Sequence, residues 1–460
     1  MSAAAAEGRL PDTATPAEAT GPMPRLIPTT GPEAAGRPGD GAVIPGGAPA
    51  SAALRRVADG YLCAGCGACA ALAPGHVSME YRLGHRRPVQ REALTAEQEA
   101  RIARICPGLG VKQDRGESRP PKLDHPVWGP IEAIRAGHSA DPELRQQASS
   151  GGALSAFLVH LLETGAVDFV LETGPDEADP MANATVISRD RADVARAAGS
   201  RYAPSAPLAG IEPLLAGEAR FAFVGKPCDV AALRAMGRDD PRVAARVPVM
   251  LSFFCAGAPS LRGARKVVEA LGAAPEEVSA FRYRGDGWPG RATATLRSGE
   301  RRGMSYADSW GEILSRHVPL RCKICVDGIG EGADIVCADA WQTDERGYPL
   351  FEEADGSSLI ITRTAAGEAL ARAAEAAGWI ETKPLDTAAI DAMQPHQLHR
   401  RQMLAARLAA MAAMGWRRPR YRGFHLLRAA AQGGPWRNLK DFLGMIKRLR
   451  AMPRAPKPRR

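Results

Sequence analysis

A run of three closely spaced cysteines constrains this sequence more than any other feature. The run reads Cys63-Ala-Gly-Cys66-Gly-Ala-Cys69, and Ala73-Pro74 follows it. Bacterial ferredoxins bind 4Fe-4S clusters with the spacing C-x2-C-x2-C-x3-C-P, in which the last cysteine binds a different cluster. Because Ala73 stands at that last position, only a distant cysteine can complete a four-cysteine site. Cys106 is followed by proline and therefore has the required Cys-Pro form.

The run predicts one 4Fe-4S cluster held by a first cysteine set, which is Cys63, Cys66, Cys69 and Cys106. The small residues between the cysteines let the backbone approach a compact cluster closely. The alternative is a structural zinc ion with four cysteine ligands. Zinc sites usually use two separated CxxC pairs, so three cysteines within seven residues favour the cluster.

Four further cysteines are far apart in the sequence and form a second cysteine set. Cys228 and Cys255 each follow a predicted strand, whereas Cys322 and Cys325 form a CxxC pair. Since strand ends of one α/β sheet meet at a common edge, the set is able to converge on a second cluster. The alternative is a zinc knuckle with two buried free thiols. The ninth cysteine, Cys337, lies in a predicted strand and is expected to be a core thiol.

Short apolar runs alternate with amphipathic segments between about residues 131 and 384. Strands are predicted over residues 167–171, 221–224, 249–254, 335–337, 359–362 and 380–383, and helices over 153–163, 230–238, 261–271 and 368–377. This alternation indicates an α/β fold, or in part α+β, with a mixed sheet.

Composition divides the chain into four parts. Residues 1–54 are rich in Ala, Gly and Pro, without a periodic apolar face, and are predicted to be disordered. Residues 55–118 form a small ferredoxin-like module, and residues 125–385 form the α/β domain. Residues 386–460 form a basic helical tail, since positions 400–460 carry a net charge of +16 and the remainder carries −7.

The uneven charge limits the possible partners. A mildly acidic body excludes nucleic acid as its ligand, because phosphate binding requires clustered positive charge. The tail segment 436–450 is amphipathic, and three roles are open: it packs on the body, binds an acidic partner such as a ferredoxin, or lies on an anionic membrane surface. The chain has no apolar stretch of 18 residues and no export signal, so a cytoplasmic location is expected.

Two glycine-rich segments suggest loops. Ser149, Ser150, Gly151 and Gly152 precede a predicted helix, and amides at a helix start can hold the pyrophosphate of a flavin dinucleotide. The alternative is an ordinary serine N-cap. Residues 285–290 match GxGxxG, but a predicted strand follows them, so a turn between strands is expected rather than a dinucleotide-binding loop.

Taken together, these motifs resemble the coenzyme F-420 hydrogenase/dehydrogenase beta-subunit family, which includes 7-hydroxymethyl chlorophyll a reductase and a ferredoxin-type divinyl chlorophyllide reductase. The resemblance covers about residues 55–385. It rests on the first cysteine run with its distant Cys-Pro-Gly, the Ser-Ser-Gly-Gly helix start, Gly-Ser200-Arg201-Tyr202, Gly-Lys226-Pro-Cys228-Asp, Phe-Phe-Cys255, Tyr-Arg-Gly285-Asp-Gly-Trp288-Pro-Gly290, Cys322-Lys-Ile-Cys325-Val-Asp and Ala-Asp334-Ile with Asp339-Ala-Trp341.

The resemblance implies an iron–sulfur flavoprotein with FAD and a second 4Fe-4S cluster, held by the second cysteine set, in the α/β domain. Such an oxidoreductase passes electrons from a ferredoxin-like donor through two 4Fe-4S clusters to FAD and on to a small organic substrate. The alternative is an electron-transfer beta subunit that docks on a larger redox partner. The surroundings of the first cysteines differ from those in the chlorophyll-reducing members, and the tail has no recognised counterpart.

The resemblance also suggests roles for single residues. Lys226 is expected to stabilise an anionic reduced flavin, with a surface lysine as the alternative. Arg201 and Tyr202 are expected to contact FAD or the substrate. Asp339 is expected to donate a proton or to orient a group, with a turn-capping residue as the alternative.

Overall fold

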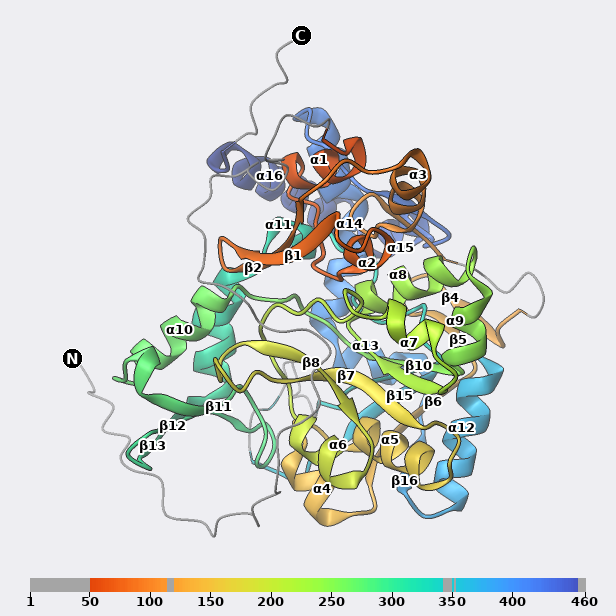
Figure 1. Cartoon of the computed structure of the whole chain (residues 1–460), viewed down its shortest axis with the longest axis vertical. Helices are drawn as coiled ribbons and strands as arrows, with labels where there is room; N and C mark the ends of the chain where they lie inside the picture. The colour runs from red at the N-terminus through yellow and green to blue at the C-terminus, as the bar shows by residue number, and fades with distance from the viewer. Residues whose placement is uncertain (1–49, 114–119, 342–349, 351–352, 454–460) are drawn as a thin grey trace.

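The centre of the computed structural model, which describes residues 50–113, 120–341, 350 and 353–453, is an eight-stranded mixed sheet (Figure 1). Its strands, in spatial order, are β16 (Ile380–Pro384), β6 (Ala133–Ser139), β15 (Ser358–Thr362), β14 (Ile335–Asp339), β10 (Val249–Phe253), β9 (Phe221–Val224), β7 (Phe169–Pro175) and β8 (Asn183–Ser188). The four strands β14, β10, β9 and β7 are parallel, and the outer strands pair antiparallel.

Helices cover both faces of this sheet. Successive residues of a strand point to opposite faces, so Phe221 and Phe223 of β9 face one helix layer and Ala222 and Val224 face the other. The first layer contains α7 (Glu212–Ala216), α8 (Pro227–Gly237), α9 (Pro241–Arg246) and, farther along the sheet, α13 (Thr387–Met393). The second contains α4 (Pro142–Gln147), α5 (Ala153–Glu163), α6 (Arg191–Ala197) and α12 (Ala365–Ala376).

The mixed α/β fold predicted from the sequence is confirmed, with differences in detail. α5 and β9 cover the predicted residues, whereas β7 begins two residues late, at Phe169. The sequence did not predict β6 and β8, because polar residues interrupt their apolar pattern. In β8 these residues are buried and bonded: Asn183 donates to the carbonyl of Ala203 and Ser188 donates to Glu172.

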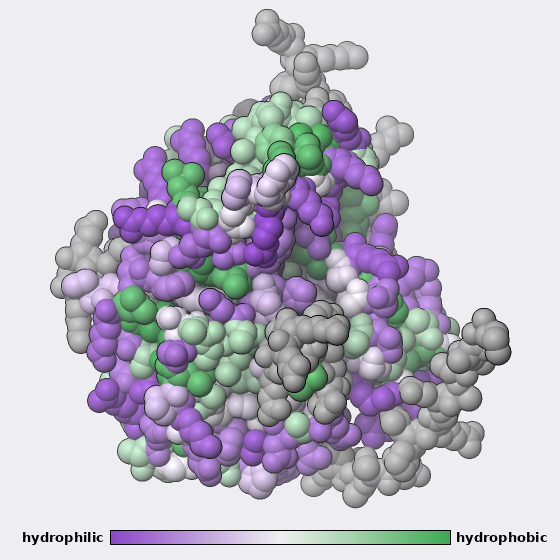
Figure 2. Space-filling model, turned by 180° about the vertical axis from the view of Figure 1, so that it is seen from behind, coloured by the Kyte–Doolittle hydropathy of each residue, from purple (hydrophilic) through white to green (hydrophobic). Residues whose placement is uncertain are grey.

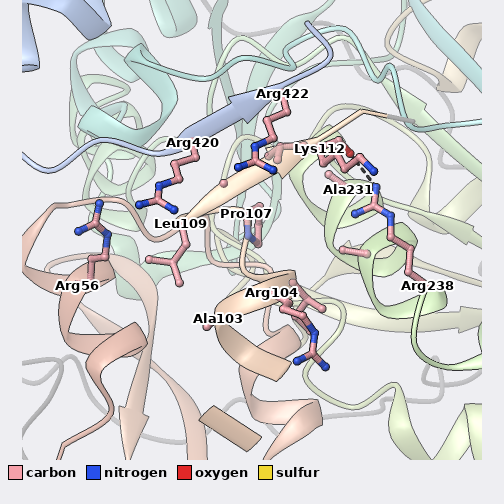
Figure 3. A pocket seen from close by; sticks show the side chains of 14 residues that line it. Arg56, Ala103, Arg104, Pro107, Leu109, Lys112, Ala231, Arg238, Arg420 and Arg422 are labelled. Carbon is pink, nitrogen blue, oxygen red and sulfur yellow. Dashed lines mark hydrogen bonds between the residues drawn. The ribbon is translucent and has the colours of Figure 1, made fainter. Parts of the chain in front are cut away.

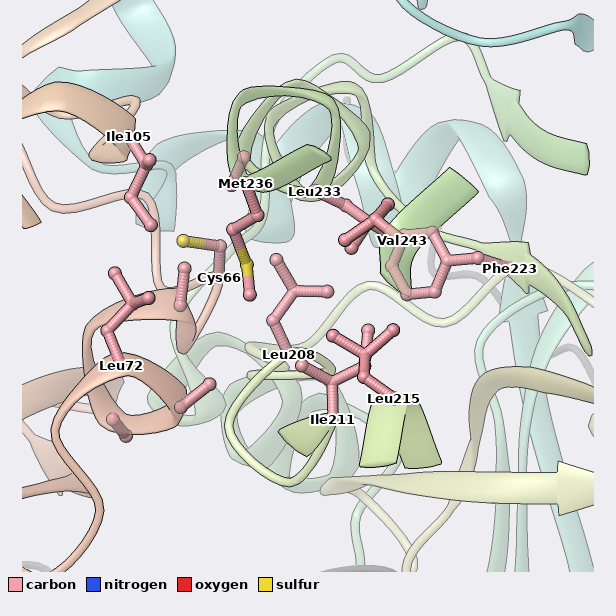
Figure 4. Close-up of a cluster of buried hydrophobic side chains, with 14 of the residues drawn as sticks. Cys66, Leu72, Ile105, Leu208, Ile211, Leu215, Phe223, Leu233, Met236 and Val243 are labelled. Carbon is pink, nitrogen blue, oxygen red and sulfur yellow. The ribbon is translucent and has the colours of Figure 1, made fainter. Parts of the chain in front are cut away.

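A small N-terminal module (residues 52–112) lies against the first helix layer. It comprises α1 (Ala52–Asp59), α2 (Ala68–Leu72), β1 (Val77–Arg82), β2 (His85–Gln90), α3 (Ala96–Ile105) and β3 (Gly110–Lys112). Cys66, Leu72 and Ile105 of the module share one core with Leu208 and Met236 of the α/β domain (Figure 4). Of the segment predicted to be disordered, residues 1–49 lie outside the described residues, and α1 begins inside it at Ala52.

One glycine permits the close contact between the module and the domain. Gly67 has a φ of +89°, in the left-handed region, and a Cβ added there would lie 2.6 Å from the amide nitrogen of Ala209. Directly beside it, the amide of Leu208 donates to the carbonyl of Cys66 over 3.0 Å. Only glycine therefore allows the backbone of the cysteine run to approach the domain this closely.

A second, three-stranded sheet lies to the side of the main sheet (Figure 1). It consists of β11 (Val278–Arg282), β12 (Arg291–Leu296) and β13 (Arg301–Ser305), and it packs with α10 (Leu261–Ala270), η2 (Pro275–Glu277), η3 (Ala307–Ile313) and η4 (Leu314–His317). The GxGxxG segment at residues 285–290 connects β11 to β12, so it is a turn between strands, as predicted.

The C-terminal segment packs on the body beside the N-terminal module. It contains α14 (Pro395–Ala413), β17 (Arg420–Arg422), α15 (Leu426–Gly433) and α16 (Pro435–Ala451). Its Met411, Met445 and Leu449 share a core with α1 and with α11 (Leu320–Lys323). Strand β17 pairs parallel with β3, and a separate hairpin joins β4 (Leu123–His125) and β5 (Gly129–Ile131).

The amphipathic face of α16 is only partly covered. Trp436, Leu439 and Leu443 are exposed, whereas Leu449 is buried. Figure 2 shows hydrophobic surface at the upper end of the molecule, the end at which Figure 1 draws the C-terminal helices. Within the residues described, no helix is both long enough and apolar enough to cross a bilayer.

A buried carboxyl group in β7 predicts a pH-dependent stability. Burial raises the pKa of Glu172 from its usual 4.5 to about 8, with a further contribution from Asp193, while the hydrogen bond from Ser188 acts in the opposite direction. The folded state therefore binds the proton more tightly than the unfolded state. The contribution of this group to stability is therefore fully present below pH 4.5 and is lost as the pH rises through 8.

Between pH 5 and pH 8, Glu172 is expected to lower the free energy of unfolding of the wild type by about 3 kcal/mol. We expect the Glu172→Gln variant to lack this decrease when unfolding in urea is measured at both pH values. The matched control is Glu163→Gln, which removes an exposed carboxylate at the end of α5. Equal pH profiles for the two variants would contradict the assignment.

Candidate functional site

The residues predicted to carry chemistry gather at the carboxyl ends of the central parallel strands. Lys226 and Cys228 follow β9, Cys255 follows β10, and Asp339 ends β14. These three strands are neighbours and run in the same direction, so their ends lie along one edge of the sheet. The CxxC pair on and after α11 reaches the same edge, because a Cβ added at Gly257, two residues after Cys255, would lie 3.2 Å from the Cβ of Cys322.

The first cysteine set surrounds a single enclosed cavity. All four of its side chains line a cavity of about 20 Å³, whose other walls come from α1, α3 and β2. The glycines at positions 65 and 67 have left-handed backbone conformations, which wrap the run around this space. The amide of Gly65 donates to the sulfur of Cys63 over 3.4 Å.

Burial and crowding act on the thiols of the first set in the same direction. Burial raises the pKa of Cys66 and Cys69 well above the usual range, and their cysteine neighbours raise it further. The same causes raise the pKa of Cys106 to about 11. The thiols of Cys66, Cys69 and Cys106 are thus poorly able to ionise by themselves, and a positively charged metal group beside them would reverse this.

The second cysteine set is brought together from three separate parts of the chain: the first turn of α8, the segment after β10, and α11 with the residues that follow it. Burial and the thiols of Cys322 and Cys325 raise the pKa of Cys255 to about 12. Burial raises the pKa of Cys228, and Cys255 and Cys325 add to this effect. The four thiols therefore influence one another although 97 positions separate Cys228 from Cys325.

Both sets offer four thiol donors, which is the ligand complement of a 4Fe-4S cluster. Within the residues described, no three Cys, His, Asp or Glu side chains lie close enough to bind one ion together. A 4Fe-4S cluster binds each cysteine through a different iron, so its ligands need not approach one another that closely. The donor chemistry of both sets therefore fits such a cluster.

Arg321 lies between the two sets. Its side chain is 2% exposed, and its Nη2 donates over 2.9 Å to the carbonyl of Pro107, next to Cys106. Burial opposes its charge, but Tyr421 and the thiols of the second set raise the pKa of Arg321 overall. Its Nε is buried and has no hydrogen-bond partner among the described residues, so one donor is left for a group placed between the thiols.

Arginines of α14 fix the loops of the second set. Arg400 donates to the carbonyl of Cys255 over 2.8 Å and to that of Cys322 over 2.9 Å. Arg407 donates to the carbonyl of Lys323 over 3.1 Å and also bonds to Asp441. Sequence reasoning missed Arg321 and both of these arginines, because no motif marks them and their partners lie far away in the sequence.

The serine side chains of the serine–glycine loop form hydrogen bonds within the protein. Ser149 shares a 2.7 Å hydrogen bond with Ser200, and Ser150 donates to the carbonyl of Ser357 over 2.9 Å. The N-cap of α5 is Gly152, with a φ of +73°, so the serine N-cap alternative is wrong. No side chain caps this helix, which leaves its first amides available to an anion.

Gly151 is required by packing within the protein. A Cβ at this position would lie 2.7 Å from the amide nitrogen of Ser358 in β15. The amide of Gly151 donates to the hydroxyl of Ser358 over 3.0 Å. Close approach to the sheet, and not only close approach to a phosphate, therefore accounts for this glycine.

Arg201 uses its guanidinium within the protein. Its Nε donates to Asn183 over 2.7 Å, and its Nη2 donates to the carbonyls of Pro180 and Ala182. Burial lowers the pKa of Arg201. These bonds fix the loop between β7 and β8, so the side chain acts on the site by positioning that loop.

Lys226 is buried, so the surface-lysine alternative is wrong. Its Nζ donates to the Asp229 carboxylate over 2.7 Å and to the hydroxyl of Ser205. Although burial lowers it, the pKa of Lys226 is raised overall by Asp229 and by the thiol of Cys228. A fixed positive charge therefore lies beside the second cysteine set.

Asp339 is fixed by a buried arginine. Arg284 donates to it through Nη1 over 2.9 Å and through Nη2 over 2.8 Å, and Trp288 adds a third hydrogen bond of 3.2 Å. Within the described residues, its carboxylate accepts from side chains and not from turn amides. The contacts with Arg284 and Trp288 fix its orientation, which suits an orienting role.

Aromatic rings surround this ion pair. The Arg284 guanidinium lies 4.6 Å from the ring centre of Tyr306 and 5.0 Å from that of Trp341. Trp341 stacks on Trp288 at 4.8 Å, and Tyr202 contacts Trp310 at 4.7 Å. This aromatic group adjoins the serine–glycine loop. The amide of Gly287, next to Trp288, donates to the carbonyl of Gln146, three residues before Ser149.

The fold and site define a mixed α/β protein with two four-cysteine sets at and beside one sheet edge. The sequence matches both parts of the family described as "Coenzyme F420 hydrogenase/dehydrogenase, beta subunit". Residues 134–211 match its N-terminal part, and residues 218–388 match its C-terminal part. The chain belongs to the coenzyme F420 hydrogenase/dehydrogenase beta-subunit family, a family of electron-transfer oxidoreductases and their subunits.

Individual relatives show moderate similarity. The coenzyme F420 hydrogenase subunit beta of Methanococcus voltae is 26% identical over 269 residues, which are 56% of this chain and 86% of that protein. The corresponding subunit of Methanothermobacter thermautotrophicus is 25% identical over 274 residues, which are 56% of this chain and 87% of that protein. The coenzyme F420-dependent sulfite reductase of Methanocaldococcus jannaschii is 23% identical over 337 residues, which are 70% of this chain and 47% of that protein.

A solved structure is also similar. It is a chain of the F420-reducing [NiFe] hydrogenase complex from Methanosarcina barkeri, with 21% identity and a TM-score of 0.44. The match covers 61% of this chain and 95% of that chain.

The α14 contacts predict a stabilising role for a tail arginine. Replacing Arg400 by Met leaves the carbonyls of Cys255 and Cys322 without these donors, which is expected to cost about 2 kcal/mol in the free energy of unfolding in urea. The matched control is Arg418→Met, because Arg418 is exposed and lies in the same segment. Equal changes in the two variants would show that the contacts of Arg400 do not stabilise the loops.

Proposed function

We propose that this chain is an iron–sulfur flavoprotein oxidoreductase that carries electrons from a ferredoxin-like donor to an organic substrate. One observation carries the proposal: eight cysteines form two sets of four, and the buried Arg321 connects one set to the other. A chain that places two such sets this near each other is suited to electron transfer between them.

In this proposal each set holds one 4Fe-4S cluster. The ligands of the first are Cys63, Cys66, Cys69 and Cys106, and those of the second are Cys228, Cys255, Cys322 and Cys325. The clusters supply one-electron transfer, and FAD supplies the conversion to two-electron chemistry. Cys66 is buried and the other seven cysteines are only partly exposed, which limits the access of water. The guanidinium of Arg321 offsets the negative charge that the ligands carry when metal is bound.

The proposed flavin site lies where the serine–glycine loop, the segment 200–205 and the end of β9 meet. Ser149 contacts Ser200, and Lys226 contacts Ser205, so one short segment joins the two sides. The uncapped first turn of α5 accepts a phosphate, and Lys226 supplies fixed positive charge. Ser150, Gly151 and Gly152 shape the loop, and Arg201 and Tyr202 position the wall beside it.

The proposed substrate site is the aromatic group around Arg284 and Asp339. Trp288 and Trp341 are buried and stacked beside Tyr306, and this gives the wall of the proposed site an aromatic character suited to a conjugated organic molecule. Arg284 holds the Asp339 carboxylate in place, so this carboxylate is able to orient a donor group of the substrate.

A second function is favoured by the names of the relatives. Two of them are beta subunits of coenzyme F420 hydrogenase, and the aligned parts span 86% and 87% of their lengths. The chain would then be an electron-transfer subunit that docks on a larger redox partner. Turnover by the isolated chain favours the first function, whereas co-purification with a large partner and no turnover alone favours the second.

Metal and flavin analysis tests the proposed function. The protein purified without oxygen is expected to contain about eight iron, eight acid-labile sulfide and one FAD per chain. Cys66→Ala and Cys325→Ala are each expected to lower the iron content to about four, because each removes a ligand from a different set. Zinc in place of iron, with no flavin, would contradict the proposal.

The matched control is Cys337→Ala. Cys337 is buried in β14, and burial alone raises its pKa, without a contribution from another thiol. This variant is expected to keep about eight iron. A loss equal to that of Cys325→Ala would show that iron content reports general unfolding rather than the removal of a ligand.

A further inference from the structure

A cavity of about 580 Å³ lies next to the first cysteine set (Figure 3). Four parts of the chain form it: α1, the end of α3 with β3, one side of α8, and β17. Its floor is apolar and includes Ile105, Pro107 and Leu109, which flank Cys106. Pro107 also lines the small cavity that the first cysteine set encloses, so one turn of chain separates the two spaces.

The rim of this cavity is strongly basic. Its charged lining residues are Arg56, Arg104, Lys112, Arg238, Arg420 and Arg422, and all of them are exposed. None of the described residues that line the cavity is acidic. Figure 3 shows the arginines of β17, α1 and α8 arranged around the apolar floor.

Most of this charge is not neutralised within the described part of the chain. Arg104 pairs with Asp239 at 2.9 Å, and Arg238 donates to the carbonyl of Lys112 over 2.8 Å. For the other four cations, the described residues provide no carboxylate partner. Uncompensated charges around a concave apolar surface produce a strong local positive potential.

Backbone pairing fixes the position of the β17 arginines. Arg420 is paired with Gly110 and Arg422 with Lys112, and alternation along β17 directs Tyr421 to the opposite side, into the C-terminal core. A Cβ at Gly110 would lie 2.5 Å from the carbonyl oxygen of Arg420. The glycine therefore permits the pairing that brings two tail arginines beside the N-terminal module.

We propose that this basic cavity is the docking site for an acidic electron donor, a small iron–sulfur protein with carboxylates around its redox centre. The inference rests on the proposed function and adds the place where the donor binds. An apolar floor with an exposed charged rim is the anatomy of a transient protein interface. A donor seated there would lie across Pro107 from the thiol of Cys106.

The six cations are also suited to a fast encounter. Exposed charges contribute mainly to the association rate and to the choice of partner, and their effect is screened by salt. The acidic remainder of this chain, with a net charge of −7 over residues 1–399, would repel an acidic donor elsewhere. The basic rim thus selects one orientation, in which the donor faces the first cysteine set.

Charge reversal of β17 tests the docking site. The holoprotein and its double variant Arg420→Glu/Arg422→Glu are titrated with oxidised bacterial ferredoxin by calorimetry at low ionic strength. We expect the variant to bind at least about tenfold more weakly, and the difference to shrink as salt is added. The matched control is Lys266→Glu/Arg316→Glu, which makes the same charge change on exposed residues of α10 and η4 and is expected to bind within about twofold of the wild type.

Three results would overturn the inference. The first is equal ferredoxin affinity of the β17 variant and the control variant. The second is equal weakening in both, which would report net charge alone. The third is unchanged ferredoxin binding with loss of inorganic phosphate binding, which would make the cavity a small-anion site.

Iron and flavin contents, measured on the same preparations, separate this inference from the proposed function. If the protein contains iron and flavin but charge reversal does not change ferredoxin binding, the proposed function stands and the docking site is contradicted. If the protein contains neither iron nor flavin, the proposed function is contradicted, whether or not ferredoxin binds.

Discussion

The buried guanidinium of Arg321 is the contact on which the arrangement of this molecule depends. It bonds to the N-terminal module at Pro107, directly precedes Cys322 of the second cysteine set, and lies 5.9 Å from the ring centre of Tyr421 in β17. A buried charge is costly unless opposite charge lies nearby. Three distant parts of the chain therefore meet at a position that favours negative charge, which thiolate ligands with bound metal would provide in the proposed function.

The same constraint explains the use of the basic C-terminal segment. Its arginines do not form a uniform charged surface. Arg400 and Arg407 point inward and bond to carbonyls of the loops that carry the second cysteine set, whereas Arg420 and Arg422 point outward around the basic cavity. The inward arginines thus fix the segments that carry the second cysteine set, and the outward arginines belong to the rim of the proposed docking site. The net charge of the C-terminal segment does not reveal this division.

Much of this organisation follows from local sequence. The CxxCGxC run, the cysteines after β9 and β10, and the uninterrupted apolar runs of the central strands carry their own signals, because spacing and periodicity are local properties. The strands β6 and β8 gave no such signal, since their polar residues are satisfied by distant partners such as Ala203 and Glu368. Arg284 and Asp339 are 55 positions apart, and no local pattern links them.

The pairing of β17 with β3 is the least predictable feature, because it joins segments about three hundred positions apart and each strand has only three residues. The amphipathic pattern of residues 436–450 correctly indicated a helix, but only part of its apolar face is buried. Periodicity identifies the faces of a helix, whereas the tertiary contacts decide which face is covered.

The central claim is that two metal clusters lie near each other across the contact between Arg321 and Pro107. The most direct measurement is electron paramagnetic resonance of the fully reduced protein. Two clusters in this arrangement are expected to give signals broadened and split by their mutual spin coupling, and Cys66→Ala is expected to leave the narrow signal of one isolated cluster. Two independent, uncoupled signals, or the signal of a single cluster in the unaltered protein, would contradict the account.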